Sequence, residues 1–149
     1  MSSQKKKEDN VVVFDSNFIL LPFQFKIDYL SDIYLHLEGR TRFYIFKQSL
    51  DEIEAKIRRE PKTRKLKRQY KGAMAYLDKN ERIYPIYFID EIKDEKETTD
   101  DFLLKWCIRF KNDYKKVFLA TNDAQFRKKA KNSHLNLIFL RQKKYLVIE

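Results

Sequence analysis

The hydrophobic positions along the chain follow two kinds of pattern. Short β-branched or aromatic runs without a polar break are typical of strands that a parallel sheet buries on both faces. Segments with apolar residues three or four positions apart are typical of amphipathic helices. The runs that predict strands are VVVF (11–14), RFYIF (42–46), IYPIYFI (83–89), VFLA (117–120), LIFL (137–140) and a short final YLVIE (145–149).

Helical patterns lie between these runs. Residues 25–39 have helical apolar spacing and end at Gly39, a suitable C-cap. Ser49 and Glu52 have the spacing of a capping box that opens the next helix. Further helices are predicted over 62–79, from Asp101 onward and after Thr121, while the charged stretch 90–101 is predicted to be an exposed loop.

This alternation of strands and helices predicts an α/β fold. We expect a three-layer α/β/α sandwich with a central parallel sheet and right-handed crossovers. With 149 residues the chain is expected to form one domain over 11–149, preceded by a flexible basic tail over 1–10. That tail lacks the apolar region of a secretion signal, and no segment approaches the roughly 18 apolar residues of a membrane span.

Composition narrows the classes of function. The chain has 32 Lys and Arg against 22 Asp and Glu, a formal charge of +10, which favours nucleic acid over a membrane as its partner because no basic amphipathic anchor is present. Gly39 and Gly72 are its only glycines, which argues against a glycine-rich phosphate-binding loop. The single cysteine, Cys107, excludes an intrachain disulfide and indicates a reducing compartment, so we expect a cytoplasmic protein.

The positive charge is concentrated around residues 56–71, where it is denser than solubility requires. We interpret this segment as a face that binds RNA phosphates, with a merely solvated surface as the alternative. Basic residues that follow Asp123 would reach phosphates beside it. The RNA-binding candidates are Arg58, Arg59, Lys62, Arg64, Lys65, Arg127 and Lys128.

Two acidic residues follow predicted strands. Asp15 comes directly after 11–14, and Asp123 comes three residues after 117–120. Ligands of an open parallel sheet bind beyond the carboxyl ends of its strands, where the strand order reverses. If these two strands are neighbours, Asp15 and Asp123 face each other at that edge. Each acid alone could equally be a helix cap or a turn residue.

Two helix starts add carboxylates at the same edge. Glu52 and Asp101 each lie near the beginning of a predicted helix, and Asp100 suits that position as well as Asp101 does. Several carboxylates at one edge repel one another unless cations lie between them. Such oxygen ligands suit Mg²⁺ or Mn²⁺, which would provide an ionised water for hydrolysis. The structural alternative for Glu52 is the capping box with Ser49.

Four segments resemble, in order, the motifs of the PIN-domain nuclease family: FDSNFIL (14–20), LDEIEAK (50–56), DDFLLKWC (100–107) and VFLATNDAQFRKKA (117–130). Within that family, residues 22–37 and 137–149 are similar to an archaeal branch related to the nuclease of the eukaryotic small-subunit processome. Trp106 and Cys107 depart from the small residues that are usual there.

The resemblance implies that Asp15, Glu52, Asp101 and Asp123 are the catalytic and metal-binding residues. It favours Asp101 over Asp100 by register, and implies supporting roles for Asn17, Asp100, Thr121 and Asn122. The implied activity is a magnesium- or manganese-dependent endoribonuclease of ribosomal RNA processing in archaea. A PIN-type toxin ribonuclease with an antitoxin partner, and a non-catalytic RNA-binding ribosome-assembly factor, are the alternatives; whether the chain forms a homodimer stays open.

Overall fold

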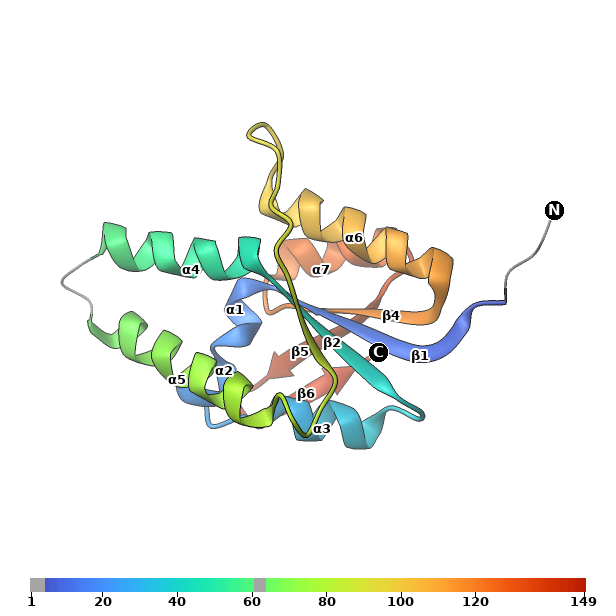
Figure 1. Cartoon of the computed structure of the whole chain (residues 1–149), viewed down its shortest axis with the longest axis horizontal. Helices are drawn as coiled ribbons and strands as arrows, with labels where there is room; N and C mark the ends of the chain where they lie inside the picture. The colour runs from blue at the N-terminus through green and yellow to red at the C-terminus, as the bar shows by residue number, and fades with distance from the viewer. Residues whose placement is uncertain (1–4, 61–63) are drawn as a thin grey trace.

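The computed structural model describes residues 5–60 and 64–149, and these form one six-stranded sheet (Figure 1). The strand order is β3-β2-β1-β4-β5-β6; β1 to β5 are parallel, and β6 runs antiparallel to β5. The strands are β1 (Lys7–Phe14), β2 (Thr41–Phe46), β3 (Ile86–Ile89), β4 (Tyr114–Ala120), β5 (Asn136–Arg141) and β6 (Tyr145–Ile148).

Helices cover both faces of this sheet. The helices are α1 (Ser16–Ile19), α2 (Leu21–Gln24), α3 (Tyr29–His36), α4 (Lys47–Arg59), α5 (Arg64–Asn80), α6 (Thr99–Asp113) and α7 (Ala124–Asn132). Residues of α1 to α5 contribute to the core on one face, and residues of α6 and α7 to the core on the other. The predicted three-layer α/β/α sandwich is therefore confirmed. No helix of the two described ranges is long and apolar enough to cross a membrane.

The two cores explain why the central strands have no polar break. Val12 and Phe14 of β1 point into one core, whereas Val11 and Val13 point into the other, and all four are fully buried. Alternate side chains of a strand face opposite sides of the sheet, so a strand covered on both sides needs apolar residues throughout.

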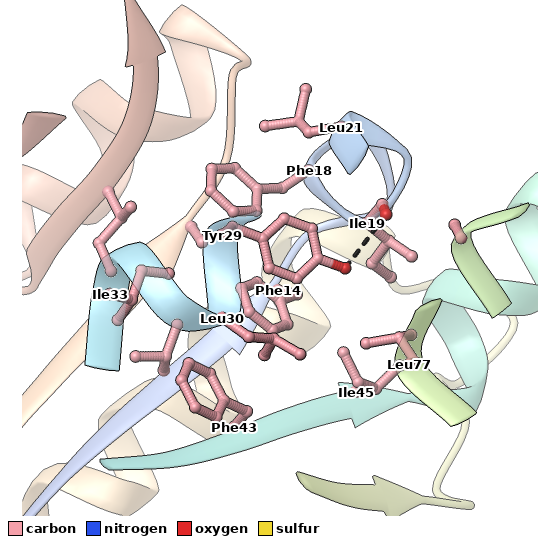
Figure 2. Packing of buried hydrophobic residues seen from close by; sticks show 14 of the residues in the cluster. Phe14, Phe18, Ile19, Leu21, Tyr29, Leu30, Ile33, Phe43, Ile45 and Leu77 are labelled. Carbon is pink, nitrogen blue, oxygen red and sulfur yellow. Dashed lines mark hydrogen bonds between the residues drawn. The ribbon is translucent and has the colours of Figure 1, made fainter. Parts of the chain in front are cut away.

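The aromatic packing at the end of β1 fixes the segment that follows it (Figure 2). The Phe14 ring lies 5.5 Å from the Phe18 ring and 4.9 Å from the Tyr29 ring, centroid to centroid. The buried Tyr29 hydroxyl donates a 3.2 Å hydrogen bond to the carbonyl oxygen of Ile19. The short α1 is thus held against the sheet, and Asp15, which precedes it, is held with it.

Strand β1 is longer than its apolar run. It begins at Lys7, so residues 7–10 of the expected tail belong to the sheet. Asn10 is buried there, and its side-chain amide donates a 2.8 Å hydrogen bond to the carbonyl oxygen of Glu38. The prediction of a tail over 1–10 extended too far, because residues 7–10 are polar and yet belong to β1, which pairs with β2 and β4.

The helix predicted over 25–39 is wrong at both ends. The chain forms α1 and α2 first, passes through Lys26 in the left-handed region (φ 55°), and begins α3 at Tyr29. Asp28 is the N-cap and accepts a 3.3 Å hydrogen bond from the amide of Ser31. The helix ends at His36, so Gly39 lies beyond it in a turn that requires its φ of 86°.

The predicted capping box is also wrong. Helix α4 begins at Lys47, directly after β2, with Phe46 as its N-cap. Ser49 therefore lies inside the first turn, where its hydroxyl is buried and has no hydrogen-bond partner among the residues that the structure describes. Glu52 lies in the second turn and is not used as a cap, which leaves its carboxylate available to the adjoining edge of the sheet.

Strand β3 and helix α6 also start at other residues than predicted. Strand β3 begins after Pro85, because proline lacks the amide hydrogen that a strand needs, and it is an edge strand as Pro85 favoured. Helix α6 begins at Thr99 rather than Asp101. Its N-cap is Thr98, whose hydroxyl accepts a 3.1 Å hydrogen bond from the amide of Asp101.

Candidate active site at the carboxyl ends of the strands

The acidic residues that the sequence singled out follow four adjacent strands of the sheet. Strand order reverses between β1 and β4, and these two end in register, with Phe14 beside Ala120. The residues are Asp15 after β1, Glu52 in α4 after β2, Asp100 and Asp101 in α6 after β3, and Asp123 after β4. We call this edge of the sheet, with those five residues, the acidic rim.

Asp15 is the most enclosed member of the rim, with 5% of its surface exposed. Its Oδ2 accepts hydrogen bonds from the Thr121 hydroxyl at 2.7 Å and from the Asn17 amide at 3.1 Å. Its Oδ1 accepts one from the amide of Ser16 at 2.8 Å. Burial raises the pKa of Asp15 to about 6, against the effect of the Thr121 and Ser16 bonds.

Asp123 is joined to Asp15 through Thr121. The Thr121 hydroxyl, which donates to Asp15, accepts a 3.1 Å hydrogen bond from the amide of Asp123. The Asp123 side chain is exposed and caps α7, accepting bonds from the amides of Gln125 and Phe126 at 2.9 and 3.2 Å. Asp123 therefore caps α7 and at the same time lies on the acidic rim.

Asn17 and Asn122 connect three strand ends. The side-chain oxygen of Asn17 accepts a 3.0 Å hydrogen bond from the amide of Asn122, which joins the segments after β1 and β4. The side-chain oxygen of Asn122 accepts a 2.9 Å bond from the amide of Leu140 in β5. Both residues thus position the loops that carry Asp15 and Asp123.

Glu52 is oriented by a residue that the sequence patterns did not identify. The hydroxyl of Thr99, which is buried at the start of α6, donates a 2.5 Å hydrogen bond to Oε1 of Glu52. This bond links α4 to α6 across 47 positions of sequence. Thr99 lies beside the acids of its motif, but nothing in a single sequence distinguishes it from a loop threonine.

Asp100 and Asp101 have different surroundings. Burial raises the pKa of Asp100, and the negative charge of Asp123 is the next largest cause, followed in the same direction by Glu52. The charges of Asp100 and Glu52 also contribute to the raised pKa of Asp15. The charges of Asp123 and Glu52 thus act on Asp100, and the charge of Asp100 acts on Asp15.

Asp101 is instead paired with a cation. Its carboxylate forms an ion pair with Lys129 of α7, and its side chain is 48% exposed. The hydrogen bond from Lys129 is the largest cause of the lowered pKa of Asp101, followed by the one with Thr98. The two neighbouring acids thus differ: Asp101 is paired with Lys129, whereas the charges of Asp123 and Glu52 act on Asp100.

The acids of the rim have the chemistry of a hard-cation site. Carboxylate oxygens are the ligands that Mg²⁺ and Mn²⁺ prefer. Within the described ranges, no three His, Cys, Asp or Glu side chains lie close enough together to enclose an ion unaided. The arrangement suits a hydrated cation, since Mg²⁺ keeps several of its waters and contacts one or two carboxylates directly.

A cavity of about 470 Å³ opens next to the rim. It lies between α1 and α2 on one side and α4 and α5 on the other, and Glu52 forms part of its wall. Lys56 and Arg59 are exposed at the same cavity. A larger cavity, of about 770 Å³, lies at the amino ends of β2 and β3, beside Arg40 and Tyr84 and away from the acids.

The predicted RNA-binding residues do not all have the same surroundings. Arg58, Arg59, Arg64, Lys65 and Lys128 are exposed, as a phosphate-binding role requires, and Lys62 lies outside the described residues. Arg59 lines the cavity next to Glu52, whereas Arg58 lines a separate groove of about 300 Å³ with Lys67 and Tyr70.

Arg127 is partly used within the fold. Its guanidinium lies over the Phe139 ring, 4.4 Å from the ring centroid, and donates a 3.4 Å hydrogen bond to the carbonyl oxygen of Thr121. Of the predicted basic residues near α7, Lys128 is therefore the freer one to contact a phosphate.

Comparison with known proteins agrees with this geometry. The PIN-domain family matches residues 12–138, which is more than half of the chain. The solved structure of the PIN domain endonuclease Utp24 superposes with a TM-score of 0.66 and 19% identity, over 93% of this chain and 90% of that one. At this identity the superposition establishes a common fold, and no curated protein sequence matches the chain significantly. The chain belongs to the PIN-domain family, which is a family of nucleases.

Proposed function

We propose that this protein is a metal-dependent endoribonuclease that hydrolyses RNA phosphodiester bonds at the acidic rim. The observation that carries the proposal is the set of carboxylates that follow four adjacent strands; the charges of Asp100 and Glu52 contribute to the raised pKa of Asp15. Burial of acids that repel one another is unfavourable, and a cation between them removes that cost.

The acids proposed to hold the hydrated cation, one or two of them directly and the others through its waters, are Asp15, Glu52, Asp123 and Asp100, the last in the role for which the family register favoured Asp101. When bound, Mg²⁺ or Mn²⁺ would supply a hydrolytic water whose pKa the ion lowers. The protein holds the two most constrained ligands in place: Thr121 and Asn17 fix the Asp15 carboxylate, and Thr99 fixes that of Glu52. Fixed ligands keep their orientation when substrate enters.

RNA as the substrate is supported by the charge distribution. The chain carries a formal charge of +10, although its rim is acidic. Exposed Arg58, Arg59, Arg64 and Lys65 lie on α4 and α5, the helices that border the cavity at the rim. Basic side chains hold the phosphate backbone largely without regard to sequence, which leaves the acidic rim for catalysis.

The setting that we propose is ribosomal RNA processing in the cytoplasm. It rests on the resemblance of residues 22–37 and 137–149 to the branch related to the processome nuclease, and on the likeness in fold to the endonuclease Utp24. We also propose that the protein binds partners in ribosome assembly.

The test is cleavage of structured RNA with Mn²⁺ by the wild type and by Asp15→Asn. We expect the wild type to cut and the variant to lose at least about 100-fold in rate, as for removal of a principal catalytic group. Equal rates would place the activity elsewhere or in a contaminant. No cleavage by either protein, with RNA binding retained, would favour the non-catalytic RNA-binding alternative.

A further inference from the structure

The cavity beside the acidic rim has residues that hydrolysis itself does not require. Residues of α1 and α2 line one side of it, and residues of α4 and α5 line the other. Figure 1 shows how these four helices are arranged. Its volume of about 470 Å³ falls in the range typical of small-molecule sites. Because Glu52 lines it, a molecule that occupies it lies next to the catalytic carboxylates.

The lining changes in character along the cavity. The side chains of Asn17 and Asn122 lie at the end near Asp15 and Asp123. Leu20 and Leu66 provide apolar walls, and Gln24 adds an amide on the side of α2. A hydrogen bond of 3.3 Å from Gln24 to Gln69 connects the two walls.

Two positively charged side chains lie beside the cavity. Lys56 and Arg59 both line it, both are exposed, and they lie one turn apart on α4. Two cations beside an amphipathic cavity, with carboxylates at its end, match the parts of a nucleotide: charged phosphates, flat apolar faces and polar edges.

We propose that this cavity binds one unstacked nucleotide of the RNA, adjacent to the phosphodiester that is cut, and so sets which nucleotide flanks the cut. This inference rests on the proposed function. Leu20 and Leu66 contact the faces of the base, and Gln24 hydrogen-bonds to its edge. Lys56 and Arg59 contact the flanking phosphates, as basic residues along a nucleic-acid groove do.

The placement of the acids explains why that nucleotide leaves its stack. Asp15 is almost fully buried, and Glu52 lies in the cavity wall. A base inside a duplex is held between its neighbours and cannot enter a cavity, whereas bases of single-stranded loops and ends can be splayed out and bound on their edges. The cavity therefore selects the nucleotide as well as the place of the cut.

The test uses four short single-stranded RNAs that differ only in the nucleotide beside the cut. Binding is measured by fluorescence anisotropy in the Asp15→Asn background, and cleavage rates are measured with Mn²⁺ in the otherwise wild-type protein. Leu66→Asp places a charge in the apolar wall and is expected to weaken binding about tenfold, the scale of losing one base contact. Leu35→Asp is the matched control, because Leu35 is 80% exposed on α3, outside the cavity, and carries the same change in charge.

Gln24→Ala provides a second variant that does not depend on core packing, since Gln24 is exposed. We expect it to reduce the ratio between the best and the worst of the four cleavage rates. If circular dichroism shows that Leu66→Asp does not fold, the effect of Gln24→Ala on this ratio of cleavage rates tests the cavity inference instead.

The two proposals fail in different ways. If the wild type cleaves with a nucleotide preference that neither Leu66→Asp nor Gln24→Ala alters, the cavity inference is overturned and the nuclease proposal stands. If Asp15→Asn binds RNA with cavity-dependent affinity but the wild type cuts none of the four RNAs, the cavity is supported as a binding site and the nuclease proposal falls.

Discussion

The hydroxyl of Thr121 donates a 2.7 Å hydrogen bond to Oδ2 of Asp15, although the two residues are 106 positions apart in the sequence. The same hydroxyl accepts a hydrogen bond from the backbone amide of Asp123. One fully buried oxygen thus fixes Asp15 and Asp123, the two acids that follow the adjacent strands β1 and β4. The geometry of the proposed site thus depends on a side chain that contacts no solvent.

Replacement of Thr121 by valine removes this connection. Thr121→Val removes one of the three donors to the Asp15 carboxylate and leaves the amide of Asp123 without this acceptor, so we expect the free energy of unfolding to fall by about 1–3 kcal/mol. Thr121→Ser keeps the hydroxyl and is expected to lose less. Urea denaturation followed by circular dichroism measures both; equal losses would show that the methyl group, and not the hydrogen bonds, matters.

The raised pKa of Asp15 predicts a stability that depends on pH in the absence of divalent cations. Burial raises this pKa from its ordinary value of 3.8 to about 6, so the folded state holds the proton more tightly than the unfolded state does. The contribution of Asp15 to the free energy of unfolding therefore falls as pH rises from about 4 to about 6, by about 3 kcal/mol in all. Asp15→Asn carries no charge and is expected to be more stable than the wild type at pH 8 and similar to it below pH 4.

The measurement is denaturation of both proteins in EDTA at several pH values. The difference between the two curves isolates Asp15 from the other titrating groups. A constant difference from pH 4 to pH 8 would contradict the raised pKa, and a wild type stabilised relative to the variant at pH 8 would contradict its sign.

Neutralising Asp100 and Asp101 separately tests which of them belongs to the site. Asp100→Asn is expected to lower the rate of RNA cleavage with Mn²⁺ at least about 100-fold, because its charge is coupled to Asp15, Glu52 and Asp123. Asp101→Asn removes an exposed ion pair with Lys129 and is expected to change the rate a few-fold at most. The reverse result would assign the role to Asp101, as the family register favoured.

Thr99 is expected to act as a positioning residue for Glu52. Thr99→Val removes the hydrogen bond to Oε1 and is expected to lower kcat about tenfold with little change in KM, whereas Thr99→Ser restores most of the rate. Steady-state kinetics of the two variants separate the hydroxyl from the packing of the side chain. If serine does not rescue, the contribution of Thr99 is structural.

Arg59 is expected to contact phosphate. Arg59→Gln should weaken the binding of single-stranded RNA and reduce the slope of log Kd against log salt concentration by about one counterion. Arg82→Gln is the control, because Arg82 is an exposed arginine beside the cavity at the opposite ends of the strands. A salt slope that changes equally in both variants would indicate a general effect of net charge.

The strands and their order of alternation with helices were predictable because the relevant forces are local. In a run such as VVVF every side chain is apolar, because helices cover both faces of the sheet. Four consecutive residues are enough to reveal that requirement. The positions of Asp15 and Asp123 just after such runs were visible for the same reason. Helix ends were less predictable: the spacing of Ser49 and Glu52 fitted a capping box, but the end of β2 at Phe46 started the helix earlier.

By itself, the sequence determined the α/β class, the family and the strand-end acids, since apolar runs and motif order are properties of contiguous residues. Only the tertiary structure decided that Asp101 pairs with Lys129 while Asp100 is coupled to the other acids. It alone showed that Thr99 holds Glu52 and that Arg58 and Arg59 line different cavities. These relationships depend on the direction of a side chain and on a partner from another element, and neither is fixed until the helices pack against the sheet.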